Sequence, residues 1–380
     1  MGMAIALLVI VAASVVFQFV SPWWTTPLAS NWKQMDDTLT ITLVITGIFF
    51  VGITLFLAFT VYRYHHREGA RAAYEPDNKK LEHWLIGVST IGIVALLAPG
   101  LVVYADYVNP PRESLVLEVL GQQWQWRFRF PGASGKMGAS DPRFVTAANP
   151  YGLDPKDPAS ADNILVTGNE VHLPINKPVK VLLRSQDVLH DFYVPPFRAR
   201  MNIVPGMVSS FWFTPTQAGR FESMCAQLCG VGHPNMHGYV VVEDEASYLA
   251  WLKKQPTFAA SFAAASAGPT DPAAAKGMAV ARTKGCVACH SIDGSLGAGP
   301  TWKGLYGKTE TFADGATSVV DDAFLKREIL EPKARIVKGF APIMPTIEVS
   351  DDELAALMAY IKSAGETGQG APVQTVQGTK

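Results

Sequence analysis

The chain has 380 residues, enough for two or three domains, of which 48% are hydrophobic and 17% charged. This composition is too apolar for a purely soluble protein and predicts membrane-spanning segments. The formal net charge of −1 leaves no basic excess, which argues against nucleic-acid binding.

Two interpretations fit the first 37 residues. Residues 3–20 are mostly apolar, but no basic stretch precedes them and no small-residue cleavage site stands out before Ser21. The segment is therefore either a signal peptide or an extra membrane span. In the second case Trp23 and Trp24 would mark the outer membrane interface.

Two long apolar runs predict a transmembrane helical hairpin over residues 38–106. Residues 38–62 form 25 consecutive positions without a formal charge, and residues 84–105 form 22 more. Pro99 lies inside the second run, where a membrane helix tolerates a kink. The intervening loop is basic, and its basic residues are Arg63, Arg67, Arg71, Lys79 and Lys80. Such a loop is expected on the cytoplasmic side, which places everything after Asp106 on the outer side of the membrane.

Residues 107–254 show the pattern of an all-β domain. Leu115, Leu117 and Val119 alternate with polar residues, as a half-buried strand does. Clusters of Gly, Pro and Asn separate further short strands, which we expect at residues 164–166, 179–183, 209–214 and 239–242. The pattern predicts a β-sandwich or barrel, with residues 131–163 as a long insertion loop.

The composition changes again after residue 254. Residues 255–271 are mainly Ala, Ser, Pro and Thr, which is typical of a linker. Residues 272–364 are predicted to form a small helical domain, whose last helix begins with the capping box Ser350-Asp-Asp-Glu353. Residues 365–380 are expected to be a flexible tail.

The four cysteines form two close pairs, a spacing that indicates two separate sites and not a disulfide framework. In the first, Cys225, Cys229, His233 and Met236 fall within 12 residues, and His190 lies upstream. Soft thiolates, imidazoles and a thioether select copper. A mononuclear blue copper site needs one Cys, so the second thiolate suggests two coppers bridged by both sulfurs. A zinc site and a redox disulfide are alternatives that leave Met236 without a role.

The region from Ser185 to Val242 resembles the CuA domain of cytochrome c oxidase subunit II. The matching motifs are Asp187-Val-Leu-His190, Val194-Pro-Pro-Phe-Arg198, Val204-Pro-Gly206 and the Cys225–Met236 loop. The resemblance implies that Cys225 and Cys229 bridge the two coppers. It further implies that His190 and His233 are the terminal ligands and that Met236 is a weak axial ligand. Gln227 would contribute its backbone carbonyl.

Position 227 departs from the family pattern. Most members have Glu there, and its side chain helps to hold a magnesium ion at the border with subunit I. Gln227 keeps the backbone carbonyl but lacks the carboxylate. The departure leaves the copper assignment intact and puts the magnesium site in doubt.

Two more residues gain a role from the resemblance. The stretch Gly121-Gln-Gln-Trp124-Gln-Trp126 resembles the family's aromatic segment, in which the first Trp passes electrons inward to copper. Trp124 is therefore a candidate electron-transfer residue, with simple packing as the alternative. Glu82 lies where many members have a carboxylate at the mouth of a proton path. The alternative is a solvated Glu stabilised at a helix start.

The second cysteine pair lies in Gly285-Cys286-Val-Ala-Cys289-His290, the attachment motif for a c-type haem. His290 would ligate iron on one face. Met344, followed by Pro and 54 residues downstream, is the candidate on the other face. A Met/His pair raises the potential of a haem. Met278 and Met358 are interpreted as core residues.

Residues 272–364 resemble the class I cytochrome c family. Gly299-Pro300 and Leu305-Tyr306-Gly307 match its loop after the attachment motif. The resemblance implies an all-α domain in which the carbonyl of Pro300 accepts a hydrogen bond from His290.

Together the resemblances cover nearly the whole chain. They indicate a multidomain membrane protein: subunit II of a cytochrome c oxidase with a fused cytochrome c domain, the caa3 type. The implied location is the bacterial inner membrane, with both redox domains on the periplasmic side.

The implied function is one-electron transfer from cytochrome c or a neighbouring respiratory complex, through haem c and CuA, to subunit I. Oxygen is reduced there and protons are pumped; subunit III and lipid are further expected partners. The main alternative is the entry subunit of a CuA-type nitric oxide reductase. A quinol oxidase subunit would lack the copper ligands, and a copper-delivery protein would not need a haem domain.

Overall fold

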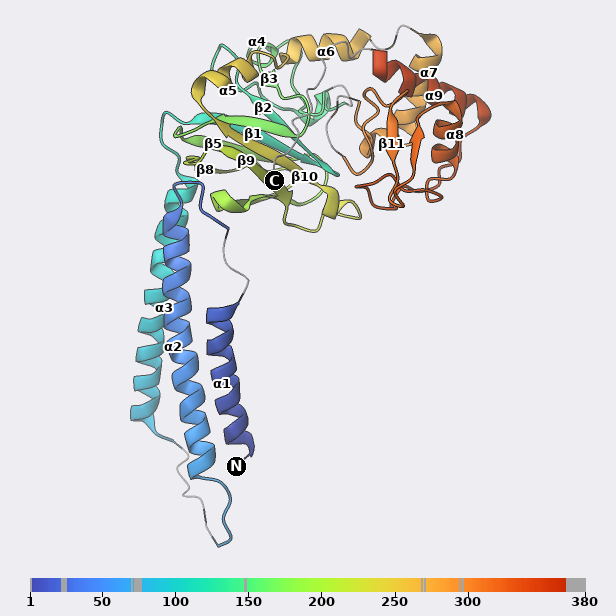
Figure 1. Cartoon of the computed structure of the whole chain (residues 1–380). Helices are drawn as coiled ribbons and strands as arrows, with labels where there is room; N and C mark the ends of the chain where they lie inside the picture. Colours follow the sequence, from blue (N-terminus) through green and yellow to red (C-terminus); the bar gives the residue numbers. More distant parts are fainter. Residues whose placement is uncertain are drawn as a thin grey trace. The chain divides into compact units, whose positions relative to one another are not determined.

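A computed structural model describes residues 2–21, 26–69, 71, 77–146, 149–267, 269, 271–292, 294 and 297–366 (Figure 1). The chain divides into two compact units, one ending at Asn109 and the other beginning at Pro110. Trp23 and Trp24, expected at the outer interface, lie outside the described residues, as does the predicted tail from residue 367 onward.

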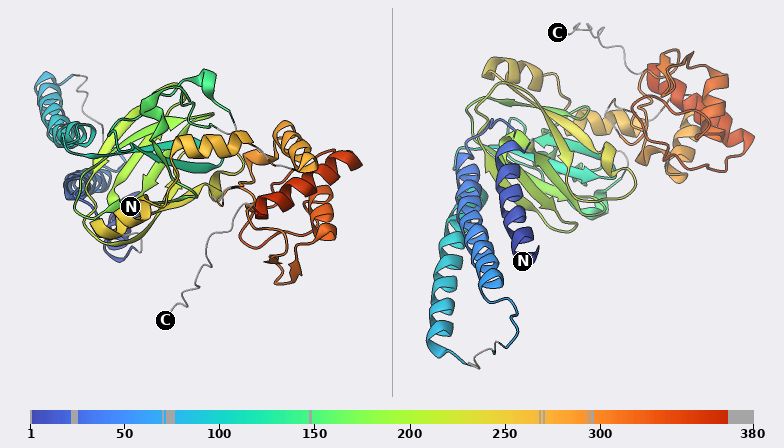
Figure 2. Two further views of the ribbon diagram at one scale, coloured as in Figure 1. Left: turned by 90° about the horizontal axis from the view of Figure 1, so that it is seen from above. Right: turned by 60° about the horizontal axis from the view of Figure 1, so that its bottom comes forward.

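Three apolar helices make up the first unit: α1 (Gly2–Val20), α2 (Lys33–Arg63) and α3 (Lys79–Val108). Each is long and apolar enough to cross a membrane. Helix α2 packs against both α1 and α3, as the views in Figures 1 and 2 show. Helices α2 and α3 confirm the predicted hairpin, and α1 has the length expected of the extra span.

Two aromatic residues join the ends of α2 and α3 that lie farthest from their connecting loop. Trp32, just before α2, and Tyr107, near the end of α3, pack edge to face with ring centroids 5.2 Å apart. Both side chains are buried. Edge-to-face packing of this kind stabilises the hairpin beyond the burial of area alone.

The second unit begins with a β-sandwich of two five-stranded sheets. One sheet has the order β3 (Ile164–Leu165), β2 (Gln125–Phe130), β1 (Leu115–Gln122), β5 (Val179–Ser185), β8 (Ser209–Phe213). The other has the order β4 (Glu170–Pro174), β10 (His237–Glu243), β9 (Gly219–Cys225), β6 (His190–Val194), β7 (Ala199–Ile203). The β1–β5 and β4–β10 pairs are parallel, and the other pairs are antiparallel.

Aromatic side chains fill the space between the two sheets. Trp126 and Phe128 of β2 lie 5.3 Å and 6.4 Å from Phe192 of β6, measured between ring centroids. All three are buried. This packing confirms the predicted sandwich, because alternate residues of each strand point to its inner face.

The strands expected from apolar alternation are present, but five others were missed: β2, β4, β6, β7 and β9. Strand β2, which reads Gln-Trp-Arg-Phe-Arg-Phe, does alternate in sequence, although two of its three polar residues are buried as well. Strand β6, which reads His-Asp-Phe-Tyr-Val, shows no clear alternation because polar and apolar residues are buried together. Arg129 in β2 and Asp191 in β6 are both almost inaccessible to solvent. Charged residues are usually exposed, so a buried one is predicted at the surface unless its partner is known.

The insertion over residues 131–163 is attached to the sandwich by hydrogen bonds from a buried arginine, Arg129, which also forms an ion pair within the sandwich. Arg129 of β2 pairs with Glu118 of β1, and their side chains are only 2% and 4% exposed. Arg129 Nη1 also donates to the carbonyl of Gly138 at 2.9 Å and to Asn163 Oδ1 at 2.7 Å. The insertion contains two short turns, η1 (Pro142–Phe144) and α4 (Pro158–Ala161).

The segment predicted as a linker differs from that expectation. After α5 (Glu245–Leu252), residues Phe258–Ala267 form helix α6. Phe258 is buried in a small cluster with Leu120, Tyr151 and Leu153, and Phe262 packs against it. The Ala-rich composition predicts a linker, but two aromatic residues, Phe258 and Phe262, pack this helix against the sandwich and its insertion.

The C-terminal part is mainly helical, as predicted. It contains α7 (Pro272–Thr283), η4 (Cys286–Ala288), α8 (Asp322–Leu330) and α9 (Asp351–Glu366), with a two-stranded ribbon of β11 (Thr309–Thr311) and β12 (Thr317–Val319) that the all-α prediction did not include. The capping box of α9 is formed as expected. The Ser350 backbone N–H donates to Glu353 Oε2 at 2.8 Å, and the Glu353 N–H donates to Ser350 Oγ at 3.3 Å.

Helices α7 and α9 pack closely because of one glycine. A Cβ at Gly277 would lie 1.9 Å from the carbonyl oxygen of Ala356. Nearby, Trp302 and Tyr360 pack edge to face in the buried core of this domain. The close packing fixes the polypeptide that follows α7, which carries the haem attachment motif.

Candidate metal centres

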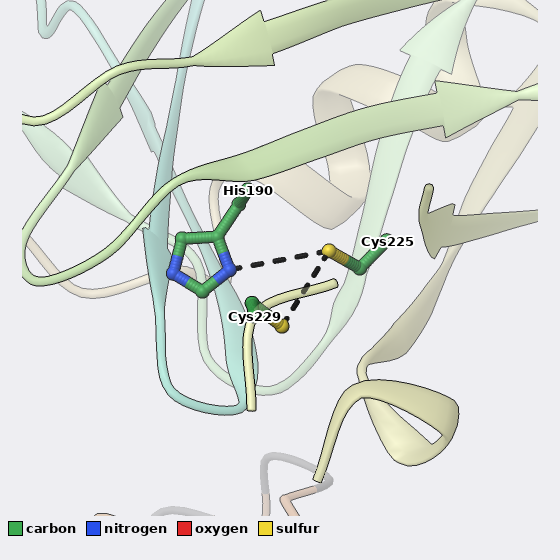
Figure 3. A group of neighbouring side chains, drawn as sticks. All are labelled: His190, Cys225 and Cys229. Atoms are coloured by element: carbon green, nitrogen blue, oxygen red, sulfur yellow. Dashed lines mark hydrogen bonds between the residues drawn. The ribbon is translucent and has the colours of Figure 1, made fainter. Parts of the chain in front are cut away.

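The five side chains predicted as copper ligands come together at one end of the sandwich. His190 begins β6 and Cys225 ends β9, while the other three lie in the loop before β10. Figure 3 shows His190, Cys225 and Cys229, whose candidate ligand atoms all lie within 4.8 Å of one another. The two sulfurs are 3.7 Å apart. They belong to free thiols and stand well beyond the ~2.05 Å of a disulfide.

Each sulfur has its own imidazole. His190 Nδ1 lies 4.0 Å from Cys225 Sγ, and His233 Nδ1 lies 3.6 Å from Cys229 Sγ. Met236 Sδ is 3.8 Å from Cys229 Sγ. The centre therefore presents two paired sulfurs, with one nitrogen for each and a single thioether.

Backbone geometry brings Gln227 to the same centre. Its carbonyl oxygen lies 3.2 Å from Cys225 Sγ. The loop is closed by the Cys225 N–H, which donates to the carbonyl of Met236 at 3.0 Å. The predicted contribution of Gln227 through its backbone is thus sterically available.

Burial and coupling set the charge of the thiols. Their mutual hydrogen bond is the largest cause that lowers the pKa of Cys225, to about 3, and His190 adds to the effect. The same coupling raises the pKa of Cys229 above its usual value. Two adjacent thiolates repel each other, and a bound cation stabilises them together. Buried thiolates, imidazoles and a thioether are soft donors that fit copper.

Asp187 fixes the orientation of His190. Its Oδ1 lies 2.8 Å from His190 Nε2, and its Oδ2 accepts from the Gln123 N–H at 2.7 Å. Burial alone would lower the pKa of His190, but the bonds to Asp187 and Cys225 raise it above its usual value. A carboxylate behind a ligating imidazole sets its tautomer and ring angle. From the sequence, Asp187 is only the first residue of the Asp187–His190 motif and has no predicted role of its own.

Trp124 lies against the copper-binding loop and is half-buried. Its Nε1–H donates to the carbonyl oxygen of Cys229 at 3.1 Å, and Gln123 Nε2 donates to the same oxygen at 2.8 Å. The indole is therefore hydrogen-bonded to the backbone of a predicted copper ligand. A Cβ at Gly232 would lie 2.3 Å from the indole Cδ2.

The haem attachment motif opens onto a cavity of about 520 Å³. The cavity is lined by Cys286, Cys289, His290 and the predicted ligand Met344. Met278 and Met358 are not among the described lining residues and pack against the hydrophobic core, as predicted. The remaining lining is mainly apolar, as a porphyrin requires, and it also includes Trp124 and Val231.

His290 is held in place from two sides. Its Nδ1 lies 2.8 Å from the carbonyl oxygen of Pro300, and its ring stacks on Trp302 with centroids 5.2 Å apart. A Cβ at Gly299 would lie 2.5 Å from its Cε1. Burial lowers the pKa of His290, which favours the neutral imidazole that ligates iron. The apolar cavity, the two thiols and this oriented imidazole fit a covalently attached haem.

Glu82 lies in the first turn of α3, in the other unit, and its side chain is exposed. Its backbone N–H donates to the carbonyl of Asn78 at 3.0 Å. A Glu in the first turn of a helix is favoured by the helix dipole. A role in proton entry stays a prediction.

Two protein-family models match the chain. The model for "Cytochrome C oxidase subunit II, periplasmic domain" matches residues 115–244, and the model for "Cytochrome c" matches residues 274–365.

Among curated proteins, the chain is 52% identical over 259 residues to the alternative cytochrome c oxidase subunit 2 of Bradyrhizobium diazoefficiens, an alignment that covers 68% of this chain and 94% of that protein. It is 24% identical over 348 residues to cytochrome c oxidase subunit 2 of Alkalihalophilus pseudofirmus, with 89% of each chain covered. Among solved structures, the periplasmic domain of subunit II of the Bradyrhizobium japonicum cytochrome oxidase aligns with 38% of this chain and 95% of that chain, at 25% identity and a TM-score of 0.29.

Proposed function

Because the chain belongs to the cytochrome c oxidase subunit II family and carries a C-terminal cytochrome c domain, we propose that it is the electron-entry subunit of a caa3-type oxidase. Family membership makes it a membrane-bound subunit of a haem-copper oxidase that associates with subunit I. In the proposed role the chain accepts electrons singly from cytochrome c or a neighbouring respiratory complex. It passes them to subunit I, which reduces oxygen to water and pumps protons.

The observation that carries this proposal is the pairing of sulfurs and imidazoles. The sulfurs of Cys225 and Cys229 lie 3.7 Å apart, and each has its own histidine nitrogen at 3.6–4.0 Å. A single zinc would use these four ligands and leave the adjacent thioether idle. Two coppers held by these residues would supply one centre for reversible one-electron exchange, and a haem held by Cys286, Cys289 and His290 would supply another.

The residues around the ligands support this role by keeping the centre rigid and dry. His190 is fully buried and fixed by Asp187, and Met236 is 1% exposed. Restricted movement and exclusion of water both reduce the rearrangement that accompanies a change of charge. Trp124, bonded to the carbonyl of Cys229, is the proposed route by which electrons enter this centre.

The proposed orientation follows from the basic loop between α2 and α3. Arg63 ends α2, and Arg67 and Arg71 follow in the loop; these basic residues favour the cytoplasmic side. The sandwich and the cytochrome domain then lie on the periplasmic side of the bacterial plasma membrane. Glu82, at the cytoplasmic end of α3, is the proposed carboxylate at a proton entrance, and subunit III and lipid are further proposed partners.

The magnesium site of the family is not part of the proposal. Gln227 directs its carbonyl oxygen toward Cys225, and its side chain is an uncharged amide. Mg²⁺ is usually bound through one or two carboxylates. Any interfacial magnesium would have to be held without a carboxylate at this position.

Metal analysis and EPR on the full-length chain, produced with haem maturation, test the proposed function. We expect two coppers per haem and a many-line signal from an electron shared by both coppers. The Cys229→Ser variant should lose that signal and keep its haem, and a variant with both Cys286→Ala and Cys289→Ala should show the reverse. One zinc per chain, or a single-copper signal, would overturn the proposal.

A further inference from the structure

The position of Trp124 depends on the shape of the copper-binding loop. Its indole Nε1–H donates to the carbonyl of Cys229, and the carbonyl also accepts a bond from Gln123. The ring then lies directly over the next few residues of the loop, two of which are the glycines Gly230 and Gly232.

Gly232 has no side chain where the indole lies. A Cβ at this position would be 2.3 Å from Trp124 Cδ2 and 2.6 Å from both Cγ and Cε3. Ordinary contacts of this kind begin near 3.4 Å. The indole ring is rigid, so it could not yield at one atom and would have to move as a whole by about 1 Å.

The backbone does not explain this glycine. Gly232 has φ −87° and ψ 4°, which other residues adopt as well. Gly230 differs, because its φ of +117° favours glycine for backbone reasons alone, and a Cβ there would still be 3.0 Å from Trp124 Cζ2. Among the described contacts, only the closeness of the Trp124 indole explains why position 232 is a glycine.

We propose that Gly232 is a positioning residue for electron entry: its missing side chain lets Trp124 lie on the loop and bond to the carbonyl of Cys229. This inference rests on the proposed function, in which Trp124 delivers electrons to the copper centre. A side chain at position 232 displaces the indole, lengthens its 3.1 Å bond to Cys229 and weakens the connection to a copper ligand. The ligands themselves are left in place.

The test is Gly232→Ala in the full-length, metal-loaded chain. We expect the copper EPR signal to be retained and hydroxyl-radical footprinting to show increased oxidation of Trp124. After flash reduction of the haem, copper reduction should slow by about threefold or more, since electron transfer falls off with distance and the 3.1 Å bond between the indole and the carbonyl of Cys229 is lengthened. Leu228→Ala is the matched control, because Leu228 is 75% exposed in the same loop, and it should change none of these.

A double variant distinguishes positioning from a general effect on the loop. With Trp124→Ala as background, Gly232→Ala should cause no further slowing, because the group it acts on is gone. Additional slowing in that background would overturn the inference. Loss of copper from Gly232→Ala would also overturn the inference, unless adding Trp124→Ala removes the clash and restores copper binding. Unchanged oxidation of Trp124 in Gly232→Ala would also overturn it.

The same variants separate the inference from the proposed function. If Trp124→Ala alone leaves copper reduction at the normal rate, the entry role of Trp124 fails. Footprinting of Trp124 still decides in that case whether Gly232 positions the indole. If Trp124→Ala slows the reaction and Gly232→Ala does not, the entry role stands and the positioning role fails.

Discussion

Replacing Arg129 by Met should destabilise the β-sandwich strongly without touching either metal site. Arg129 is a buried residue of strand β2 that pairs with Glu118 of β1. It also donates hydrogen bonds to the Gly138 carbonyl and the Asn163 side chain in the insertion. Met keeps most of the aliphatic volume but supplies no donor. Glu118 would be left buried, with Arg184 Nη1 at 3.6 Å from its Oε1 as a weaker partner.

The expected magnitude follows from burial. Removing one partner of a buried ion pair costs about 3–5 kcal/mol, and the contact with Arg184 favours the lower part of that range. For a domain of this size, about 1 kcal/mol shifts Tm by about 2–4 °C, so a cost of about 3–4 kcal/mol corresponds to an expected fall of about 6–16 °C. Replacing both partners, with Glu118→Leu added, should recover much of the loss, because an apolar pair avoids the buried charge.

The assay is thermal unfolding of the full-length chain in detergent, followed by near-UV circular dichroism and by the copper absorption bands. Arg143→Met is the matched control. Arg143 also forms an ion pair in the insertion, with Asp141, but its side chain is 82% exposed, and such pairs contribute about 0–1 kcal/mol. If Arg129→Met lowers Tm no more than Arg143→Met does, the buried network does not hold the insertion to the sandwich.

Three substitutions test the metal centres. Met236→Leu should retain both coppers and shift their midpoint potential, because a thioether is a weak axial ligand; complete loss of copper would refute that assignment. Met344→Ala should leave the haem covalently attached and abolish the methionine–iron charge-transfer band in the red part of the spectrum, and persistence of the band would identify another ligand. Asp187→Asn should weaken copper affinity by about 10–100-fold, measured by chelator competition, with haem content as the control; unchanged affinity would mean that Asp187 does not support His190.

The sequence was sufficient wherever a feature depends on residues close together in the chain. Uninterrupted apolar runs predicted α2 and α3, because a membrane span is a matter of length and hydropathy. Four of the copper ligands fall within 12 residues, and the haem attachment motif within five, so their spacing alone indicates their chemistry. The capping box of α9 was also predicted correctly, since both of its bonds join residues three positions apart.

Tertiary structure decided the features that join distant segments. The bond from Trp124 to Cys229 spans 105 positions, and the bond from Gln123 to Asp187 spans 64. Neither leaves a periodic signal, because contacts of this kind depend on which strands pair and in which register. Arg129 resembles a surface residue until its buried partner is placed beside it. Gly232 resembles any loop glycine until the indole of Trp124 lies on it.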